Sequence, residues 1–440
     1  MRLRRRGRGP SRTGLPALAL TVLASLALLA GCASGPAGPP TLTWYINPDD
    51  GGQAEIAERC TDAAGGRYSI AISTLPRESS DQRQELVRRL AANDSSIDII
   101  SLDPPYIPEF AEAGFLAPVP PGVAARVTEG VVPSAIEGAS WRGNLVTVPF
   151  WANTQLLWYR KSLVADMGLD LSKPVTWDQI IDAASAKGTK VAAQGRRAES
   201  LMVWANALIR SGGGQIVTNQ AESNPDLIQL GLTEPPAVDA ARIMRKLATS
   251  PAAVPGFSTS DEDSNSESFQ SGDAAFMVNW PFVWSKVTKA AQEGTVPADV
   301  PNDYGAALFP QTRPDLPSAP PYGGINLGVG AFSEHPDLAY AATECITNAA
   351  NGAYYFATNG NPSARVASYS DPEVLAKYPM APVILQSLTQ AKPRPQTAYY
   401  AEVSAGLQRA FHPPEAINPG PTNQAAQDLI LAVLRKEALL

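Results

Sequence analysis

The chain has 440 residues, of which 44% are hydrophobic and 18% are charged, so it can bury a large core in more than one lobe. Its formal net charge is −7, and its basic residues cluster only in the first twelve positions, which argues against nucleic acid as a partner. The sequence has no CxxC motif and no glycine-rich motif of a dinucleotide or phosphate site. Its two histidines, each close to a proline, argue against a histidine-based metal site or catalytic triad.

The N-terminal segment has the three parts of a bacterial export signal. Six arginines among the first twelve residues precede an apolar run at residues 15–30, which is shorter than a membrane-spanning helix. The run ends in LAGC, which matches the lipobox that precedes a lipidated cysteine. We therefore predict a signal peptide at residues 1–31, lipidation of Cys32 and a flexible tether at residues 32–40. The lipid would hold the mature protein on the outer face of the cytoplasmic membrane.

Strands and helices alternate in the segment that follows the tether. Strands are predicted at residues 41–46, 68–75 and 97–103, and helices at residues 51–66, 79–94 and 106–114. This alternation predicts βαβ units around a parallel sheet. Because ligands of such sheets lie at the carboxyl ends of the strands, Asp49 and Asp103 are candidate site residues.

Later parts of the chain mix helices with isolated strands. Residues 144–164 read as two apolar strands interrupted around residues 149–153, and an amphipathic helix follows Thr176. Helices then dominate, but further strands are predicted at residues 303–311 and 322–332. Strands so late in the chain indicate that it returns to an earlier sheet.

Two cysteines lie beyond the predicted lipidation site. Cys60 and Cys345 could form one disulfide, as is common in exported proteins, or could be buried free thiols on separate helices. Their separation in sequence does not decide between the two.

The order of these pieces resembles the solute-binding lipoproteins of bacterial ABC sugar importers, the extracellular solute-binding protein family 1. The resemblance rests on the lipobox and, in chain order, on DIISLDPPYIPEFAEAGFLAPV, LVTVPFWANTQLLWYRKSLV, PVTWDQII, QSGDAAFMVNWPFVW and GGINLGVG. Together these pieces run from Cys32 to about Arg394. Each piece alone is a weak signal, and their order and spacing make the resemblance specific.

The resemblance implies an α/β, two-lobe periplasmic-binding-protein fold, type II-like, with parallel-rich sheets flanked by helices and a hinge between the lobes. Lobe 1 would comprise residues 41–150 plus about 319–335, and lobe 2 residues 151–318 plus about 336–440. The lobes would close over a ligand in the cleft between them. The protein would not be an enzyme and would need no cofactor or metal. Its partners would be ABC permease subunits and a cytoplasmic ATPase.

Within the family the resemblance extends to trehalose-binding members, which implies a disaccharide, and trehalose in particular, as the ligand. Carried over position by position, the sugar-contacting residues would be Asp49, Gln82, Asp103, Asn153, Glu262, Asn279, Trp280, Gly324 and Arg394. Carboxylates accept hydroxyl protons in charge-assisted bonds, and amide and guanidinium groups pair further hydroxyls. A tryptophan covers the C–H face of a sugar ring, and the glycine would offer backbone groups. These residue types suit a neutral sugar.

Structural roles compete with several of these assignments. Asp103 could cap the next helix, Asn153 could hold a turn, and Glu262 could be a solvated helix start. Arg394, in a loop between prolines, could lie on the surface.

The stretch MVNWPFVW contains two tryptophans with different expected roles. Trp280 is expected at the cleft as a platform for a sugar ring, and Trp284 is expected to anchor the start of the next helix. Trp158, Trp177 and Trp204 lie in regular apolar patterns and are expected in the core.

Two other functions compete at this point. An exported glycoside hydrolase would use an acid–base pair among Asp49, Asp103 and Glu262, although no hydrolase motif surrounds these residues. A receptor for another oligosaccharide or for a glycerophosphodiester would keep the fold and change the ligand. A phosphodiester usually requires clustered positive charge, which Arg394 alone does not supply.

Overall fold

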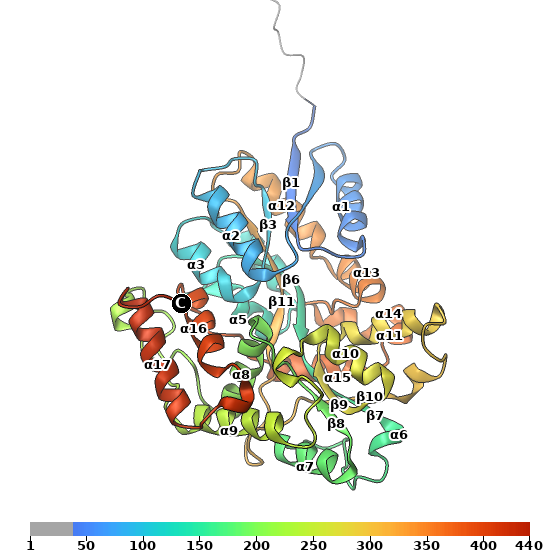
Figure 1. Ribbon diagram of the computed structural model, residues 1–440. Helices are drawn as coiled ribbons and strands as arrows, with labels where there is room; N and C mark the ends of the chain where they lie inside the picture. Colours follow the sequence, from blue (N-terminus) through green and yellow to red (C-terminus); the bar gives the residue numbers. More distant parts are fainter. Residues whose placement is uncertain (1–37) are drawn as a thin grey trace, which may run out of the picture. The chain divides into compact units, whose positions relative to one another are not determined.

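The computed structural model describes residues 38–440 (Figure 1). The predicted signal peptide, the lipidation site Cys32 and all but the last three residues of the predicted tether lie outside this range. Within residues 38–440, no helix has the length and apolar character needed to cross a membrane.

The first sheet has five strands in the order β2-β1-β3-β11-β6. Its strands are β1 Thr41–Ile46, β2 Ser69–Thr74, β3 Ile99–Leu102, β6 Val148–Thr154 and β11 Tyr322–Val329. The first three strands are parallel, as the βαβ pattern predicted. Strand β11 lies antiparallel between β3 and β6, which confirms that the chain returns to the first sheet.

Alternation along β1 distributes its side chains to the two faces of this sheet. Leu42 and Trp44 join a core on one face, and Tyr45 joins the core on the other face. The helices that follow these strands are α1 Gly52–Ala63, α2 Ser79–Leu90, α3 Ile107–Glu112, α4 Pro121–Thr128 and α5 Pro133–Gly138. A short two-stranded sheet follows, β4 Ser140–Trp141 and β5 Asn144–Leu145.

The second sheet has four strands in the order β10-β7-β9-β8. Its strands are β7 Leu156–Arg160, β8 Lys190–Ala192, β9 Ala274–Asn279 and β10 Tyr304–Ala307. Strands β8 and β9 are parallel, and β7 is antiparallel to both β9 and β10. The accompanying helices are α6 Lys161–Val164, α7 Trp177–Lys187, α8 Glu199–Ser211, α9 Pro235–Thr249, α10 Glu262–Ser271 and α11 Phe282–Gln292.

Three tryptophans form the core of this second lobe. Trp158, Trp177 and Trp204 are fully buried, as predicted, and the rings of the last two are 5.5 Å apart. Helix α7 begins where the sequence indicated, because Thr176 and Gln179 form a capping box.

The chain crosses from the first sheet to the second at one residue. Strand β6 ends at Thr154 and β7 begins at Leu156, so Gln155 alone separates them. The predicted interruption at residues 149–153 was therefore wrong. Pro149 is tolerated inside β6 because β6 is an edge strand of its sheet, at a point where its register with β11 shifts.

One predicted domain boundary also needs correction. Helices α12 Pro336–Ile346 and α13 Ala349–Asn359 pack on α1 at the first sheet, although residues from about 336 onward were assigned to lobe 2. The apolar face of α12, with Ala339 and Tyr340, completes the core beneath Trp44. The remaining helices are α14 Pro372–Lys377, α15 Ala381–Gln390, α16 Tyr400–Phe411 and α17 Pro421–Leu434.

A disulfide ties α12 to α1. Cys60 and Cys345, whose state the sequence left open, are joined across a separation of 285 residues. The bond links the start of the first lobe to the helix that returns to it.

Replacing both cysteines by serine should lower the free energy of unfolding by about 2–5 kcal/mol, because the unfolded chain loses a long closed loop. Urea titration with and without dithiothreitol would measure this effect. The reductant should destabilise the wild-type protein and leave the Cys60→Ser/Cys345→Ser variant unchanged. Equal stability of the wild-type protein in both conditions would contradict the prediction.

Candidate functional site

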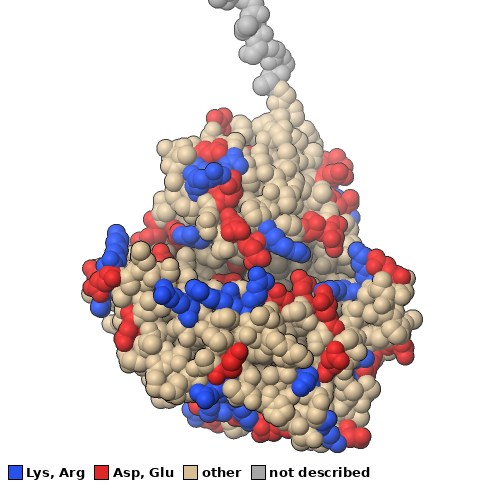
Figure 2. All heavy atoms as spheres, viewed as in Figure 1, with Lys and Arg blue, Asp and Glu red and all other residues tan. Residues whose placement is uncertain are grey.

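A cavity of about 560 Å³ lies where the two sheets and their helices meet. On the face drawn in Figure 2 the surface is hollowed across its middle, with acidic and basic side chains along the hollow. Seven of the nine predicted sugar-contacting residues line the cavity: Gln82, Asp103, Asn153, Glu262, Trp280, Gly324 and Arg394. The fold thus brings together positions from seven separate parts of the chain.

Arg394 is buried at the cavity wall, with only 5% of its surface exposed. It pairs with the carboxylate of Asp103, which follows β3, and donates to Glu199 Oε1 at the start of α8 over 2.8 Å. Burial alone disfavours the charged guanidinium, but Asp103, Tyr400 and Glu199 outweigh it and hold the pKa of Arg394 well above its ordinary value. The surface alternative for Arg394 was therefore wrong, and its charge is matched within the protein.

Asp103 uses both carboxylate oxygens in side-chain contacts. One oxygen pairs with Arg394, and the other accepts a hydrogen bond of 2.8 Å from Ser79 Oγ. Although Asp103 precedes a short 3₁₀ helix, its side chain makes no capping bond there. The capping alternative does not hold, because the carboxylate points to the cavity wall and not to the helix backbone.

Trp280, Asn279 and Glu262 form one unit at the end of β9. The fully buried Asn279 donates from Nδ2 to the carbonyl of Glu262 over 2.9 Å, and its Oδ1 accepts from the backbone N–H of Trp280 over 2.9 Å. Asn279 therefore positions these two lining residues and does not itself line the cavity, which corrects its predicted role as a sugar contact.

A close approach of backbone sets the position of the Trp280 ring. A Cβ atom at Gly323 would lie 3.0 Å from two ring carbons of Trp280. Because Gly323 has no side chain, the ring can pack against the backbone of β11. Gly324 has a φ of +110°, and a Cβ there would lie 2.1 Å from the carbonyl oxygen of Trp151. Both glycines are needed for the indole and the β11 backbone to form one wall.

Glu262 lines the cavity from the first turn of α10. The helix is capped by Asp261, whose side chain accepts from the backbone N–H of Ser264, so Glu262 is free of that role. Burial, followed by the charges of Asp261 and Asp263, raises the pKa of Glu262 to about 7. The structure therefore places Glu262 in the cavity lining, and the alternative of a solvent-exposed residue at the start of a helix does not hold.

The other predicted residues have the following places. Gln82 donates from Nε2 to the carbonyl of Pro76 over 2.8 Å, and Asn153 accepts from the N–H of Thr154 over 3.0 Å. Asp49 does not line the cavity. Both of its carboxylate oxygens accept backbone N–H groups at the start of α1, so its predicted sugar contact is replaced by a role in the turn.

The sequence analysis missed several polar lining residues, and two of them, Trp151 and Ser200, carry polar atoms without a partner in residues 38–440. Trp151 Nε1 and Ser200 Oγ are buried at the cavity and have no hydrogen-bond partner among the described residues, as is also true of Arg394 Nε. Trp151 lies two residues before Asn153 on β6, so strand alternation could have indicated it. Ser200 lies within α8, where no local pattern distinguishes it.

The charged side chains that line the cavity are mainly acidic. They comprise the carboxylates Glu78, Asp103, Glu199, Asp261, Glu262 and Asp263 and the guanidinium groups Arg77, Arg196 and Arg394. Two of these guanidinium groups already pair with lining carboxylates, Arg196 with Asp261 and Arg394 with Asp103. The lining therefore suits a neutral, hydroxyl-rich ligand better than an anion.

Two α/β lobes enclose a polar cavity with one aromatic wall, an arrangement suited to holding a small ligand. The chain belongs to the family of bacterial extracellular solute-binding proteins, whose model matches residues 67–353. This confirms the family that the sequence resembles.

Two curated relatives and one solved structure show how far the similarity extends. The chain is 25% identical over 361 residues to a probable ABC transporter-binding protein of Deinococcus radiodurans, covering 78% of this chain and 81% of that protein. It is 25% identical over 335 residues to the mannitol-binding protein of Pseudomonas aeruginosa, covering 74% of each. Maltose-bound MalE3 of T. maritima is 26% identical with a TM-score of 0.74, covering 91% of this chain and 100% of that chain. The predicted two-lobe α/β fold is confirmed.

Replacing Arg394 by alanine should lower the free energy of unfolding by about 3–5 kcal/mol, because it leaves two carboxylates without their buried partner. Chemical denaturation would measure the loss. Arg313→Ala, which removes an exposed pair with Asp315, is the matched control and should have no measurable effect. Similar small effects of both substitutions would contradict the buried charge cluster.

The Glu262 carboxyl should make stability depend on pH. Its pKa is about 7 in the folded protein and 4.5 ordinarily, so the folded state binds more protons between these values and the contribution to stability falls as pH rises through them. Glu262→Gln should therefore gain stability relative to the wild-type protein from about pH 4.5 to about pH 7. Thermal melts of both proteins across this range test the prediction, and a difference that does not change with pH would refute it.

Proposed function

We propose that this protein is the substrate-binding lipoprotein of an ABC importer. It captures a neutral disaccharide in the cavity between the lobes, and trehalose is the disaccharide that we propose. It then delivers the sugar to the permease subunits, which a cytoplasmic ATPase powers. The observation that carries the proposal is the cavity lining, which combines the Trp280 indole, held against β11 at Gly323, with carboxylate and amide side chains.

The lining matches the hydrogen-bonding needs of a sugar. Hydroxyl groups both donate and accept, and a buried polar group without a partner costs about 1–3 kcal/mol. Glu262, Gln82 and Asn153 contribute carboxylate and amide groups to the lining, and Trp151 Nε1 and Arg394 Nε, buried in the residues of its wall, lack partners among the described residues. The Trp280 ring supplies the apolar face that a pyranose ring requires.

Names and motifs of similar proteins support a sugar as the ligand. One relative is named a mannitol-binding protein, and one structural neighbour holds maltose. The preference for trehalose rests on the resemblance to the mycobacterial trehalose-binding lipoprotein LpqY in the segments EFAEAG, NTQLLWYR, VNWPFV and GGINL. Lipid anchoring at Cys32 is part of the proposal and rests on the lipobox.

The alternative functions have weaker support. The acidic lining disfavours a glycerophosphodiester, because its phosphate would face carboxylates. A hydrolase would need an acid–base pair, but Asp49 is outside the lining and Asp103 is engaged by Ser79 and Arg394. The family and its similar proteins are solute-binding proteins and not enzymes. Another oligosaccharide remains the nearest alternative ligand.

A thermal-shift screen over trehalose, maltose, mannitol and glycerophosphocholine, followed by calorimetry, tests the proposal. We expect a disaccharide to bind and to be recovered intact. Stoichiometric release of glucose from trehalose would favour a hydrolase. A response to glycerophosphocholine alone would overturn the sugar assignment.

Trp280→Ala should weaken disaccharide binding by about 1–3 kcal/mol, because the ring loses a stacking surface in a desolvated pocket. Calorimetry measures the change, with a thermal melt to show that the variant is folded. Tyr354→Ala, at a half-buried aromatic away from the cavity that stacks with Arg59, is the control and should bind as the wild-type protein does. Unchanged affinity in folded Trp280→Ala would remove the stacking role.

A further inference from the structure

One arginine of the cavity lining has no counter-charge. Arg77 lies in the loop between β2 and α2 and lines both the cavity described above and a neighbouring one of about 1250 Å³. Its side chain is exposed and, within residues 38–440, makes no hydrogen bond or ion pair. The other two lining guanidinium groups, those of Arg196 and Arg394, are both paired with carboxylates. Arg77 therefore carries a charge that the protein has not matched.

The backbone that carries Arg77 is held in place. At the end of β2 the N–H of Leu75 donates to the carbonyl of Ile46 over 2.8 Å. Gln82 Nε2, from the first turn of α2, donates to the carbonyl of Pro76 over 2.8 Å. The proline ring also fixes φ at that position. The fold thus sets where the Arg77 side chain begins and leaves the guanidinium without a restraining contact.

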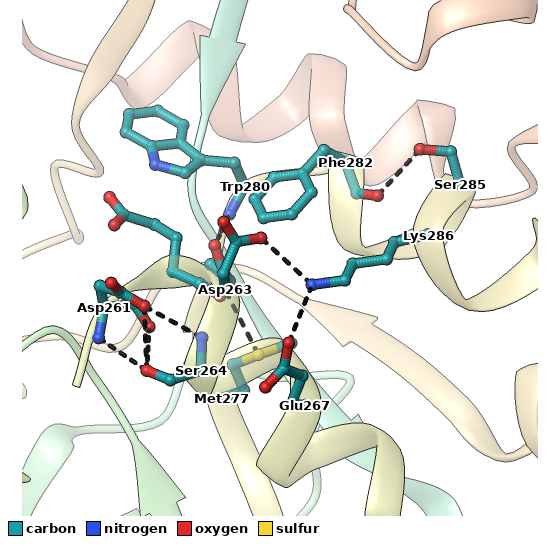
Figure 3. A network of polar contacts seen from close by, with 11 residues as sticks. Asp261, Asp263, Ser264, Glu267, Met277, Trp280, Phe282, Ser285 and Lys286 are labelled. Atoms are coloured by element: carbon teal, nitrogen blue, oxygen red, sulfur yellow. Dashed lines mark hydrogen bonds and ion pairs between the residues drawn. The ribbon is translucent and has the colours of Figure 1, made fainter. Parts of the chain in front are cut away.

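The unmatched carboxylate of the second lobe is Glu262. Its two neighbours in the chain are paired, Asp261 with Arg196 over 3.0 Å and Asp263 with Lys286 over 3.1 Å (Figure 3). Glu262 lines the same two cavities and makes no ion pair within residues 38–440. Burial and the two neighbouring carboxylates raise its pKa to about 7. Its carboxyl therefore lacks the cation that would favour the ionised form.

The other charged groups of these two linings do not supply that cation. Arg394 is held by two carboxylates, and Lys377 pairs with Glu373 over 2.8 Å. Lys289 lines only the neighbouring cavity and belongs to the same lobe as Glu262, so lobe closure would not bring the two together. Three further carboxylates disfavour a charge at this position: Asp50, Glu78 and Glu293.

We propose that Arg77 pairs with Glu262 across the cavity when the lobes close on a ligand, so that the carboxyl of Glu262 releases its proton to the solvent. The two side chains line the same cavities from opposite lobes, and each lacks a partner among the described residues. Their ion pair would exist only in the closed form and would stabilise it. Arg77 is then a positioning residue that acts through Glu262. This inference rests on the proposed function, because it assumes that the lobes close over a sugar.

The pairing would make affinity depend on pH. In the unliganded protein Glu262 is mostly protonated below about pH 7, whereas beside Arg77 it would be ionised down to its ordinary range near 4.5. Because binding then releases a proton, affinity should rise by about tenfold per pH unit from about pH 5 to about pH 7. Above that range Glu262 has no proton to release, and affinity should be constant.

Calorimetry with trehalose tests the inference on the purified protein. Titrations at pH 6 in two buffers of different ionisation enthalpy count the protons released, and titrations from pH 5 to pH 8 give the slope. We expect close to one proton in the wild-type protein and in Arg77→Lys, which keeps the charge. Arg77→Gln should release none and should bind with little dependence on pH. Arg88→Gln, at an exposed arginine of α2 outside both linings, is the control and should behave as the wild-type protein does.

The outcomes separate this inference from the proposed function. Binding of trehalose by the wild-type protein without proton release, or with proton uptake, would overturn the inference and leave the proposed function standing. An equal loss of affinity at every pH in Arg77→Gln would show that the arginine does not act through Glu262, and would also overturn it. If neither trehalose nor maltose binds, the proposed function fails and this inference fails with it.

Discussion

The cavity depends on one buried guanidinium group. Arg394 joins Asp103, at the end of a strand in the first sheet, to Glu199, at the start of a helix packed in the second lobe. Without it, two carboxylates would lie in a desolvated region with no counter-charge, which is strongly unfavourable. The guanidinium lies 5.8 Å from the centre of the Tyr400 ring, which packs edge to face on Tyr106, and the Tyr400 hydroxyl donates to Glu199. The charge cluster therefore sets the spacing of the cavity walls as well as their polarity.

Internal pairing of the charges leaves neutral hydrogen-bonding groups for a ligand. Among the lining groups without partners in the described residues, Ser200 Oγ and Trp151 Nε1 are uncharged, and Arg394 Nε belongs to a guanidinium whose charge is already matched. Burial also favours the protonated form of Glu262 below about pH 7. Trp280 and Phe282 add apolar aromatic surface to the lining of the same cavity. This combination of matched charges, neutral donors and aromatic faces is the physical basis for proposing a sugar.

The sequence predicted the parts of the fold that depend on local periodicity. The parallel strands β1 to β3, the start of α7 at Thr176 and the late return of β11 all follow from alternation, capping and apolar runs. The errors occur where a distant segment decides the outcome. Helix α12 packs on the first sheet because Trp44 and Cys60 lie there, and nothing within α12 indicates which core its apolar face will join.

The same division applies to the cavity. By itself the sequence determined the family pattern, the acidic composition and the residue types suited to a sugar, because these are properties of short segments and of their order. Only the tertiary structure decided which polar atoms are free. It assigned the carboxylate of Asp49 to the turn before α1, the amide of Asn279 to positioning Trp280, and the indole N–H of Trp284 to the carbonyl of Lys377. The reason is that burial and long-range partners, such as those of Arg394 with Asp103 and Glu199, exist only in the folded chain. Even the local backbone partners of Asp49 and Asn279 depend on a turn and a strand end whose conformation packing fixes.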